Sequence, residues 1–374
     1  MPREPLEAIV LVGGQGTRLR PLTLSAPKPL LPTAGVPFLA HLLAQAASFG
    51  VTHVVLATCY KADMFAAVLG DGSAYGLSLD FVQETVPLDT AGGIRNAASS
   101  LRGTGSGDPV VVLNSDILSG HDLGAQVDLH IKTDAAATLH LVEVTDPSRF
   151  GVVPTDASGR VTAFLEKTPD PVTNRINAGC YVFRRSVIDQ IPAGRRVSVE
   201  RETFPGLIES GELVMGYHEA AYWLDVGTPQ TFVQGSCDLV LGRLPAPALD
   251  LLLGRLPAPA GLSRERSALR LEGASVAADA AVSGGTVVGA GATVAAGATV
   301  SGSVLFDGAT VGEGAVVRDS ILGRGAVVAP GAVLDEAVIG DGAFIGSGNE
   351  LARGIRVWPD VRIEPTSVRF SSDV

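Results

Sequence analysis

The sequence predicts an α/β domain with a mostly parallel sheet, followed by a C-terminal domain of stacked β-coils. Two observations predict this order: β-branched runs alternate with helical stretches over the first two-thirds of the chain, and a 17-residue repeat fills much of the last third. A Pro/Ala-rich duplication separates the two patterns. With 374 residues, of which 46% are hydrophobic, the chain is long enough to bury two cores.

The first two-thirds of the chain alternate predicted strands with predicted helices. The strands are expected at Ala8–Val12, Val51–Ala57, Leu77–Phe81, Val110–Leu113, Ala137–Val144 and Tyr181–Phe183, and the helices at Phe38–Ser48 and Asp122–Lys132. Such alternation is typical of a largely parallel sheet, in which ligands bind beyond the carboxyl ends of the strands. We therefore expect ligand-binding residues directly after Val12 and Leu113, at residues 13–18 and 114–116.

A duplicated octapeptide marks the boundary between the two patterns. Residues 241–248 and 253–260 both read LGRLPAPA, and a Pro/Ala-rich stretch of this kind is not expected to hold a regular helix or sheet. We interpret residues 241–262 as a linker between domains of residues 1–240 and 263–374. An interaction motif is the alternative interpretation.

The C-terminal domain has a repeat of aliphatic residues in steps of 6, 6 and 5. Segments that start at Val288, Leu305, Leu322 and Ile339 align with one another and carry glycines at matching positions. One such coil cannot bury its apolar residues alone, so the copies must stack, with glycine at the tight corners. Hexapeptide steps of this kind resemble the left-handed parallel β-helix, and an irregular β-sandwich is the alternative.

The overall composition excludes several classes of protein. A net charge of −11 argues against general nucleic-acid binding, so an anionic ligand needs a local cluster of cations. Cys59, Cys180 and Cys237 lie far apart without a CxxC pair, which argues against a disulfide framework and a structural zinc site. The run Ala8–Val12 is too short for a signal peptide or a membrane span. We therefore expect a cytoplasmic protein with no membrane and no nucleic-acid partner.

The strongest local signal is the segment LVGGQGTRLRPLTLSAPKP at residues 11–29. It matches neither a Walker A loop nor the Rossmann GxGxxG fingerprint. Its glycines nevertheless allow backbone N–H groups to approach an anion, while Arg18 and Lys28 add a forked and a compact cation. The segment therefore favours phosphate binding, and a surface turn with two solvated cations is the alternative.

This segment resembles the signature GGxGTRLxPLTxxxPKP of the sugar-1-phosphate nucleotidyltransferases. Later motifs resemble the GDP-mannose pyrophosphorylases in particular: LNSD at 113–116, PSRFGVV at 147–153, FLEKTP at 164–169, INAGCYV at 176–182, SVERETFP at 198–205 and YWLDVGTP at 222–229. The resemblance spans nearly the whole chain. It implies a Rossmann-like, mostly parallel nucleotidyltransferase domain followed by a left-handed parallel β-helix.

The family joins a nucleoside triphosphate to a sugar 1-phosphate and releases pyrophosphate. Because two anions must meet, the protein has to supply positive charge and alignment. The resemblance implies that Arg18 contacts the departing pyrophosphate and that Lys28 stabilises charge at the α-phosphate. It makes Asp116 and Asp225 the ligands of Mg²⁺, an ion that suits one or two carboxylates plus phosphate oxygens. For either aspartate taken alone, a cap or turn at a strand end is the alternative.

The resemblance also implies where the two substrates bind. Lys167 would hold the phosphate of the sugar 1-phosphate and Glu166 would accept hydrogen bonds from sugar hydroxyls, although a solvated strand end is the alternative for this pair. The remaining sugar-site residues would be Gly151, Asn177 and Gly179, for which an ordinary turn is the alternative. The implied nucleotide site consists of Leu11, Gly13, Gly14, Gly16, Thr17, Gln83, Asp89 and Gly92.

One position departs from the family pattern. PLDTAG at residues 87–92 carries Asp89 where the family has a glycine. A carboxylate can accept hydrogen bonds from guanine, so Asp89 is compatible with GTP if it faces the base, and it can equally point to solvent. We expect GTP and mannose 1-phosphate as substrates. Heptose or glucose 1-phosphate, or dTTP or UTP, are the alternatives.

Two other classes of function compete with this interpretation. An acyltransferase with a β-helix would need a histidine base between coils, but all six histidines precede the linker: His41, His53, His121, His130, His140 and His218. A non-catalytic regulatory subunit would have lost the catalytic residues, which are present here. We expect the β-helix to pack against the catalytic domain or a second subunit, giving a homo-oligomer, a dimer or larger.

Overall fold

The computed structural model describes residues 5–59, 61–103, 105–250, 264–265 and 267–369. Within these residues the chain forms two compact units, each built from two segments. The sheet unit contains the residues up to Gly14 and those from Leu42 to Trp223, and the β-helix unit contains those from Gln15 to His41 and from Leu224 onward. The motif at residues 11–29 is therefore divided between the two units.

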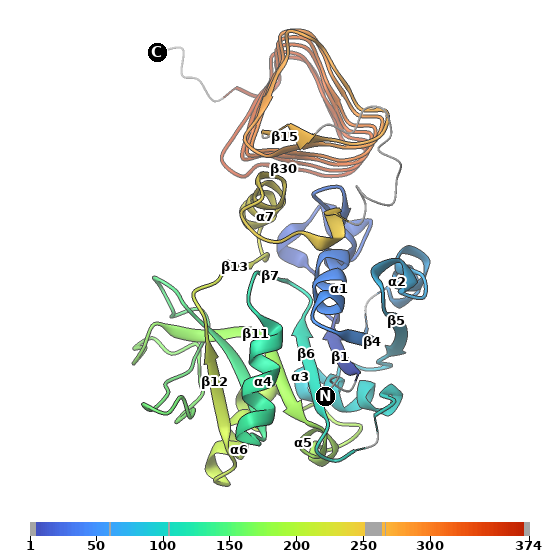
Figure 1. Ribbon diagram of the computed structural model, residues 1–374. Coiled ribbons are helices and arrows are strands. Elements are labelled where there is room, and N and C mark those ends of the chain that lie inside the picture. The colour runs from blue at the N-terminus through green and yellow to red at the C-terminus, as the bar shows by residue number, and fades with distance from the viewer. Residues whose placement is uncertain (1–4, 60, 104, 251–263, 266, 370–374) are drawn as a thin grey trace. The chain divides into compact units, whose positions relative to one another are not determined.

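The sheet unit is built around a nine-stranded mixed sheet, whose main path has the order β10-β9-β11-β6-β1-β4-β5 (Figure 1). Strands β6, β1, β4 and β5 are parallel, and β11 joins them antiparallel to β6. β8 pairs antiparallel with β11 and parallel with β12. The bounds are β1 Leu6–Leu11, β4 Val51–Thr58, β5 Ser78–Gln83, β6 Pro109–Asn114, β8 Ala137–Glu143, β9 Gly151–Val152, β10 Leu165–Glu166, β11 Arg175–Arg184 and β12 Val214–His218.

The six strands expected from the sequence all occur, with shifts of a few residues at their ends. β1, β4 and β6 are buried along most of their length, as expected of strands covered on both faces. Tyr181–Phe183 is the last part of a strand that begins at Arg175, and this strand is antiparallel to its neighbours β6 and β8. The sheet is thus parallel from β6 to its edge at β5, and mixed on the side of β11.

Helices cover the sheet. α3 packs against β1 and β4, while α4 packs against β8 and β11. α1 has the predicted bounds, and α4 begins one residue late because Asp122 is its N-cap and accepts from the backbone N–H of Ala125 at 2.9 Å. The bounds are α1 Phe38–Ser48, α2 Ala62–Leu69, α3 Asp89–Ala97, α4 Leu123–Thr133, α5 Arg185–Gln190, α6 Phe204–Glu209, α7 Pro229–Leu241 and the π-helix η6 Val199–Thr203.

Shorter elements complete the fold. These are the 3-10 turns η1 Thr17–Leu19, η2 Leu22–Leu24, η3 Lys28–Leu30, η4 Ser73–Tyr75 and η5 Ala98–Ser100, and the strands β2 Pro32–Thr33, β3 Val36–Pro37, β7 Ile117–Ser119 and β13 Trp223–Asp225.

None of the helices in the described ranges is long and apolar enough to cross a membrane.

The core of the sheet unit combines aliphatic strand residues with a group of aromatic rings. Tyr181 and Phe183 lie in β11, and both contact the ring of Phe204 from α6, at centroid distances of 5.2 and 5.6 Å. All three side chains are fully buried. Burying one such side chain stabilises the fold by roughly 1.5–3 kcal/mol, so this group contributes substantially to holding α6 against β11.

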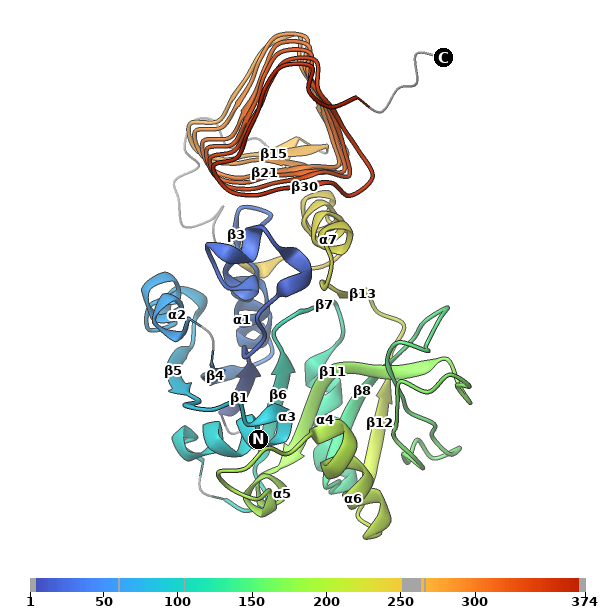
Figure 2. The same cartoon turned by 180° about the vertical axis from the view of Figure 1, so that it is seen from behind.

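The β-helix unit contains three parallel sheets that form the faces of a triangular prism (Figures 1 and 2). The first face consists of β15 Ala268–Arg270, β18 Thr286–Val288, β21 Val304–Leu305, β24 Ile321–Leu322, β27 Val338–Ile339 and β30 Arg356–Val357, with β14 Arg264–Glu265 antiparallel to β15. The second consists of β16 Ser275–Val276, β19 Thr293–Val294, β22 Thr310–Val311, β25 Val327–Val328, β28 Phe344–Ile345 and β31 Arg362–Ile363. The third consists of β17 Ala281–Ser283, β20 Thr299–Ser301, β23 Val316–Arg318, β26 Val333–Asp335 and β29 Glu350–Leu351.

Strand partners confirm the repeat. Val304 pairs with Ile321, and Ile321 with Val338, so neighbouring coils are 17 residues apart there. The first and last coils are one residue longer, because Ala268 pairs with Thr286 and Val338 with Arg356. The parallel, triangular coil expected from the hexapeptide steps is therefore present, as in a left-handed parallel β-helix.

One corner of the prism shows how a five-residue step is accommodated. The residues that turn this corner, Gly302, Asp319 and Glu336, have φ angles of 54°, 45° and 52°. Beside them, the hydroxyls of Ser303 and Ser320 accept from backbone N–H groups 17 residues later, at 3.1 and 2.9 Å. These bonds satisfy buried amides that the strands leave unpaired.

The duplicated octapeptide is more ordered than its composition predicts. α7 ends at Gly242, whose left-handed conformation closes the helix, and residues 247–250 are again helical. The expectation that LGRLPAPA holds no regular structure is wrong at the two ends of the first copy, because Leu241 ends α7 and Pro247 stands in the first turn of a helix, where its missing N–H removes no bond. Residues 242–246 between them lie in neither helix nor strand. Leu244 and Leu249 are buried. The second copy, at 253–260, lies outside the described residues.

Candidate active site

The candidate site residues are divided between the two units. Arg18, Lys28 and Asp225 belong to the β-helix unit, together with Gly16 and Thr17. The sheet unit holds the rest, namely Leu11, Gly13, Gly14, Gln83, Asp89, Gly92, Asp116, Gly151, Glu166, Lys167, Asn177 and Gly179. Their convergence on one substrate complex stays a prediction.

In the sheet unit, the expected loops follow neighbouring strand ends. Leu11, the last residue of β1, pairs with Asn114, the last residue of β6, and the backbone N–H of Ser115 donates to the carbonyl of Leu11 at 3.3 Å. Gly13 and Asp116 therefore leave the sheet at the same edge. This is the carboxyl edge of the parallel strands, where the sequence places ligand-binding residues.

In the β-helix unit, Gly16 brings the two ends of the cation-bearing segment together. Its φ is 61°, and a Cβ at this position would lie 3.0 Å from the Cβ of Lys28 and from the Cγ2 of Thr23. The hydroxyl of Thr23 donates to the carbonyl of Gly16 at 2.9 Å. A glycine is thus required both by the backbone conformation and by the close approach of Lys28.

Arg18 contacts a second predicted motif in the same unit. Its guanidinium Nη2 lies 2.8 Å from the place where a Cβ of Gly227 would be, so only a glycine leaves room for it. Gly227 follows Asp225 by two residues and precedes Thr228, the N-cap of α7. The motifs GGxGTRL and LDVGTP, far apart in the sequence, therefore meet at the arginine and the glycine.

Other contacts hold this segment to the rest of the β-helix unit. The backbone N–H of Ala34 donates to the Ser236 hydroxyl of α7 at 2.9 Å, and Nη1 of Arg356 donates to the carbonyl of Arg20 at 2.9 Å. A Cβ at Gly35 would lie 2.8 Å from a methyl group of Leu271. The segment with Arg18 and Lys28 is thus supported by the first coil, by β30 of the final, partial coil and by α7.

The two candidate metal ligands are half-buried carboxylates, Asp116 and Asp225. Within the described ranges, no cluster of three or more His, Cys, Asp or Glu side chains is arranged to hold a metal ion. One or two aspartates suit an ion that takes its other ligands from phosphate and water, and they do not suit an ion that needs a closed protein cage. The donor chemistry therefore fits Mg²⁺.

The candidate sugar-phosphate residues Glu166 and Lys167 form an ion pair at the end of β10. Lys167 Nζ lies 3.3 Å from Glu166 Oε1, with the lysine side chain 63% exposed. A Cβ at Gly151 would lie 2.7 Å from the Phe164 ring and 3.0 Å from Glu166 Oε2, so glycine is required there. An ion pair with a lysine this exposed contributes little to stability, which leaves the lysine available to a ligand.

A bulge in β11 orients the candidate residue Asn177. The register between β11 and β8 shifts between Asn177 and Tyr181, and Gly179 within the bulge has a φ of 78°. Asn177 donates to the buried Tyr181 hydroxyl at 2.7 Å and accepts from the backbone N–H of Gly179 at 3.1 Å. Gly179 also lies against the side chain of Asn114, so the motifs LNSD and INAGCYV meet.

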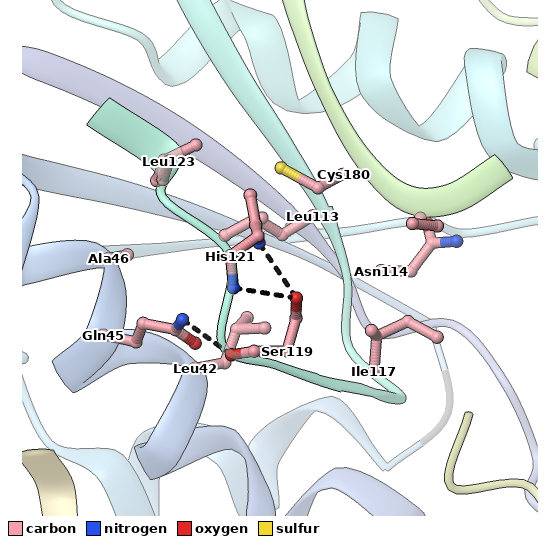
Figure 3. A pocket seen from close by; sticks show the side chains of 12 residues that line it. Leu42, Gln45, Ala46, Leu113, Asn114, Ile117, Ser119, His121, Leu123 and Cys180 are labelled. Atoms are coloured by element: carbon pink, nitrogen blue, oxygen red, sulfur yellow. Dashed lines mark hydrogen bonds between the residues drawn. The ribbon is translucent and has the colours of Figure 1, made fainter. Parts of the chain in front are cut away.

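Asn114 and Gly179, at which these two motifs meet, also line the pocket shown in Figure 3. Gln45 and His121 form hydrogen bonds at its wall, to the carbonyl and the hydroxyl of Ser119, at 2.7 and 3.0 Å. Its space, about 20 Å³, is enough for one water molecule and far too small for a sugar. Its lining consists of Leu42, Gln45, Ala46, Leu113, Asn114, Ile117, Ser119, His121, Leu123, Ala178, Gly179 and Cys180.

Near that pocket, buried histidines are held in the neutral form. His121 stacks on His140 with ring centroids 4.0 Å apart. Burial lowers the pKa of His140 to about 2, with further contributions from His121 and His218. Burial also lowers the pKa of His121, and it lowers that of His130 to about 4.

Two of the residues expected in the nucleotide site, Asp89 and Gly92, lie in the first turn of α3. Asp89 has a φ of 62°, a conformation that glycine adopts without strain and aspartate tolerates, so the glycine of the family pattern suits the same backbone. Its Oδ1 accepts from the Thr90 N–H at 2.9 Å. Gly92 is buried, and a Cβ there would lie 2.7 Å from the carbonyl of Arg195. In this structure Gly92 serves the packing of α3.

Two carboxylates were not expected from the sequence. Glu84 follows Gln83 at the end of β5, and its Oε2 accepts from the Leu88 N–H at 3.0 Å. Glu200 lies in η6, and its Oε2 accepts from the Thr90 and Ser198 hydroxyls at 2.8 Å each. The sequence could have indicated Glu84, because it directly follows Gln83. It could also have indicated Glu200, because this residue lies in the motif SVERETFP.

A mostly parallel sheet with glycine-rich and acidic turns at its carboxyl edge, joined to a parallel β-helix, defines a nucleotidyltransferase. A family model described as Nucleotidyl transferase matches residues 7–240, and one described as GMPPB C-terminal domain matches residues 267–370. The Mannose-1-phosphate guanylyltransferase of Mycobacterium tuberculosis (strain ATCC 25618 / H37Rv) is 52% identical over 375 residues, which cover 100% of both chains. The chain therefore belongs to the nucleotidyl transferase family and, within it, to the mannose-1-phosphate guanylyltransferases, which are enzymes.

More distant relatives match a little under two-thirds of the chain. The Mannose-1-phosphate guanyltransferase of Candida albicans is 40% identical over 235 residues, which cover 62% of this chain and 64% of that protein. The crystal structure of HddC from Yersinia pseudotuberculosis complexed with GMP-PN has a TM-score of 0.53 at 27% identity, and covers 63% of this chain and 99% of that one. A putative glucose-1-phosphate thymidylyltransferase from Bacillus anthracis, with a TM-score of 0.56 at 22% identity over 62% and 94%, shares the fold.

Proposed function

We propose that the chain transfers the guanylyl group of GTP to mannose 1-phosphate, which forms GDP-mannose and pyrophosphate. The observation that carries this proposal is the 52% identity to a Mannose-1-phosphate guanylyltransferase over the full length of both chains. The guanine nucleotide in the crystal structure of HddC also supports a base of this kind. A nucleotidyltransferase for another sugar 1-phosphate or another base is the second candidate.

The chemistry needs alignment and positive charge. A phosphate oxygen of mannose 1-phosphate attacks the α-phosphorus of GTP, and the bond to the β-phosphate oxygen breaks, which releases pyrophosphate. No covalent intermediate with the protein is required. The main barrier is the approach of two anions, so cationic side chains and backbone N–H groups that face the phosphates accelerate the reaction.

Two cations of the β-helix unit are assigned to the triphosphate. Arg18 contacts the departing pyrophosphate, because its planar fork can donate two parallel hydrogen bonds to phosphate oxygens. Lys28 stabilises the charge that develops at the α-phosphate. The close packing of Gly16 against Lys28, and of Gly227 against Arg18, supports this assignment because it restricts where both side chains can lie.

Asp116 and Asp225 are assigned to Mg²⁺. When bound, the ion neutralises phosphate charge and orients the phosphate oxygens. The carboxylates fix its position relative to the chain, and their half-buried setting limits competing hydration.

The sugar 1-phosphate is assigned to the side of the sheet unit formed by β9, β10 and β11. Lys167 binds its phosphate, and Glu166 accepts hydrogen bonds from sugar hydroxyls. Hydrogen bonds with Tyr181 and Gly179 restrict the side chain of Asn177. Asn177 therefore presents an amide of fixed orientation to the sugar ring. The small residues Gly151 and Gly179 allow the substrate to approach the backbone.

The nucleotide is assigned to the edge where β1 and β5 end. The residues assigned to the nucleotide are Leu11, Gly13, Gly14, Gln83, Asp89 and Gly92 of the sheet unit, and Gly16 and Thr17 of the β-helix unit. Gly92 supports the site through packing, since it is buried beneath Arg195. We also propose a homo-oligomer, a dimer or larger, that involves the β-helix coils.

The test is a substrate panel with the full-length protein. Four NTPs are combined with mannose, glucose and heptose 1-phosphates in the presence of Mg²⁺, and pyrophosphate release is followed. We expect the highest kcat/KM for GTP with mannose 1-phosphate. A higher value for another pair would replace the assignment of base or sugar, and no release from any pair would indicate a regulatory subunit.

A further inference from the structure

We propose that Arg196 is a positioning residue for the nucleotide: its guanidinium neutralises Asp89, whose charge would otherwise repel the triphosphate from the first turn of α3. This inference rests on the proposed function, because that function assigns a nucleoside triphosphate to the surroundings of Asp89. It adds a cation that lies outside the signature motifs and acts through another side chain.

Three carboxylates surround the start of α3. Asp89 is the first residue of the helix, and Glu84 Oε2 accepts from the N–H of Leu88, the residue before it, at 3.0 Å. Glu200 Oε2 accepts from the hydroxyl of Thr90, the residue after it, at 2.8 Å. Burial raises the pKa of Glu84, and the negative charge of Asp89 adds to this effect. A nucleotide with several negative charges therefore meets an acidic surface at this end of the helix.

The backbone donors that follow Asp89 are already used within the chain. The N–H of Thr90 donates to Asp89 Oδ1 at 2.9 Å. The N–H groups of Ala91 and Gly92 both donate to the carbonyl of Val197, at 2.9 and 3.1 Å. These three groups are therefore not available to phosphate oxygens, as the free N–H groups at the start of other helices are. A side chain has to compensate the charge of Asp89.

Arg196 is held beside Asp89 by its two neighbours in the chain. Val197 accepts the two hydrogen bonds from α3, and the carbonyl oxygen of Arg195 lies 2.7 Å from the place where a Cβ of Gly92 would be. Nη2 of Arg196 lies 3.9 Å from Asp89 Oδ2. Within the part of the chain that the structure describes, no other ion pair involves one of the three carboxylates.

The exposure of this pair suits an effect on a ligand better than an effect on the fold. The side chain of Arg196 is 74% exposed and that of Asp89 is 40% exposed. Ion pairs of this kind contribute little to folding stability, and salt weakens them further. A surface charge beside an anion-binding site nevertheless changes how strongly the site attracts a charged substrate.

The residue at position 89 explains why this chain needs the cation. The φ of Asp89 is 62°, and the glycine of the family pattern suits the same backbone without adding a charge. With a glycine there, no carboxylate would remain for Arg196 to neutralise. Removal of the aspartate should therefore compensate for removal of the arginine.

The experiment measures KM and kcat for GTP, at saturating mannose 1-phosphate, in the full-length wild type, Arg196→Gln, Asp89→Gly and the double variant. R196Q should raise KM roughly two- to fivefold, because the uncovered carboxylate repels the nucleotide. The value of kcat should change little, since the repulsion acts on the ground state and the transition state alike. The double variant should return KM to near the wild-type value.

Two further measurements separate this effect from a structural one. Arg196→Lys should keep KM near the wild-type value, because it keeps the charge. High salt should reduce the difference in KM between the wild type and R196Q, because it screens exposed charges. Thermal unfolding of each variant checks that it is folded.

Arg102→Gln is the matched control. Nη2 of Arg102 lies 3.6 Å from Asp80 Oδ2, and the two side chains are 60% and 46% exposed. Arg102 also donates to the hydroxyl of Ser78, the first residue of β5, so this pair lies toward the amino end of the strand. The nucleotide is assigned to the opposite end. We therefore expect R102Q to leave KM for GTP unchanged.

Several results would overturn the inference. An unchanged KM in R196Q would show that Arg196 does not affect the nucleotide, and an equal rise in R102Q would show an effect of overall charge. A rise of KM in D89G would show that Asp89 binds the nucleotide rather than repels it. A fall of kcat in R196Q without a change in KM would place Arg196 in the chemical step.

Failure of the proposed function looks different. In that case the wild type releases no pyrophosphate from GTP and mannose 1-phosphate, or it prefers another pair of substrates. With another pair, the same variants can be compared on the preferred nucleoside triphosphate, because the repulsion depends on its phosphates and not on its base.

Discussion

The sheet unit and the coils of the β-helix unit bury their polar groups in different ways. The sheet unit buries ionisable side chains, such as His53, His130 and His140. In the described coils the buried polar side chains are neutral, namely Thr286, Ser303, Ser320 and Asn349. The comparison teaches that buried groups sensitive to protonation lie outside the described coils, which provide a support whose order depends on stacking between neighbours.

The largest expected effect is a loss of kcat on replacing either candidate metal ligand, one of which lies in each unit. Asp116 belongs to the sheet unit and Asp225 to the β-helix unit. We expect Asp116→Asn and Asp225→Asn each to lower kcat about 100-fold or more, because each weakens the binding of Mg²⁺, with little loss of folded protein. Steady-state kinetics over a range of Mg²⁺ concentrations, with circular dichroism as the control, measures this. Near-normal turnover in either variant contradicts the metal assignment.

A matched pair of core leucines compares how the two units respond to a cavity. Leu139 in β8 and Leu334 in β26 are both fully buried. Replacing either by alanine should lower the free energy of unfolding by about 2–5 kcal/mol. The loss of hydrogen-exchange protection should stay near the adjacent coils for L334A, because each coil contacts only its neighbours, and should spread through the sheet for L139A. Protection lost equally along all coils in L334A would refute the comparison.

Acid should destabilise the sheet unit through its neutral histidines. The pKa of His140 falls from about 6.5 in the unfolded chain to about 2 in the folded one. The unfolded state thus binds the proton first, so stability is complete above pH 6.5 and decreases as the pH falls below it. At pH 5 this histidine alone should lower the free energy of unfolding by about 2 kcal/mol.

Denaturant unfolding of His140→Phe at two pH values measures this effect. The variant should resist acid better than the wild type at pH 5, because the phenyl ring does not titrate. At pH 8 the two proteins should differ much less. An unchanged difference in stability between pH 8 and pH 5 would show that His140 does not cause the acid sensitivity.

The smallest expected effect tests the corner of the coils. Glu336 has a φ of 52°, which favours glycine. Glu336→Gly should therefore raise the free energy of unfolding by up to about 1 kcal/mol. Glu313, which is exposed and has no positive φ, is the control, and Glu313→Gly should be destabilising by roughly 0.5–1 kcal/mol. Thermal unfolding of both variants measures the difference, and a shift of the same sign in both would contradict the strain argument.

Much of the fold could be predicted because its signals are local or periodic. The helix Phe38–Ser48 and the buried strands β1, β4 and β6 follow from apolar patterns within single segments. The coils follow from the repeat itself. The antiparallel placement of β11 beside β6 could not be predicted, since a strand's sequence does not reveal its partner. Neither could the helical turn at 247–250, whose composition favours a linker.

The roles of the candidate site residues stay predictions, whereas their local surroundings can be compared with the sequence. The signature motifs indicated Arg18 and Asp116, because their residue order is specific to the family. Glu84 was missed, since its position between β5 and α3 arises from contacts with Thr58 and Gly93, which no local pattern shows. The packing role of Gly92 was missed for the same reason, as its neighbour Arg195 lies about a hundred residues later.

The division of the signature motif has a consequence for how relatives can be recombined. Residues 15–41 are held by α7, by Leu271 and by Arg356, all in the same unit. In a chimera that takes its coils from one homologue and all preceding residues from another, residues 15–41 would pack against coils to which they are not matched. Exchanges that carry residues 15–41 and 224–374 together from one parent should keep that fit, so these stretches are expected to diverge in concert during evolution.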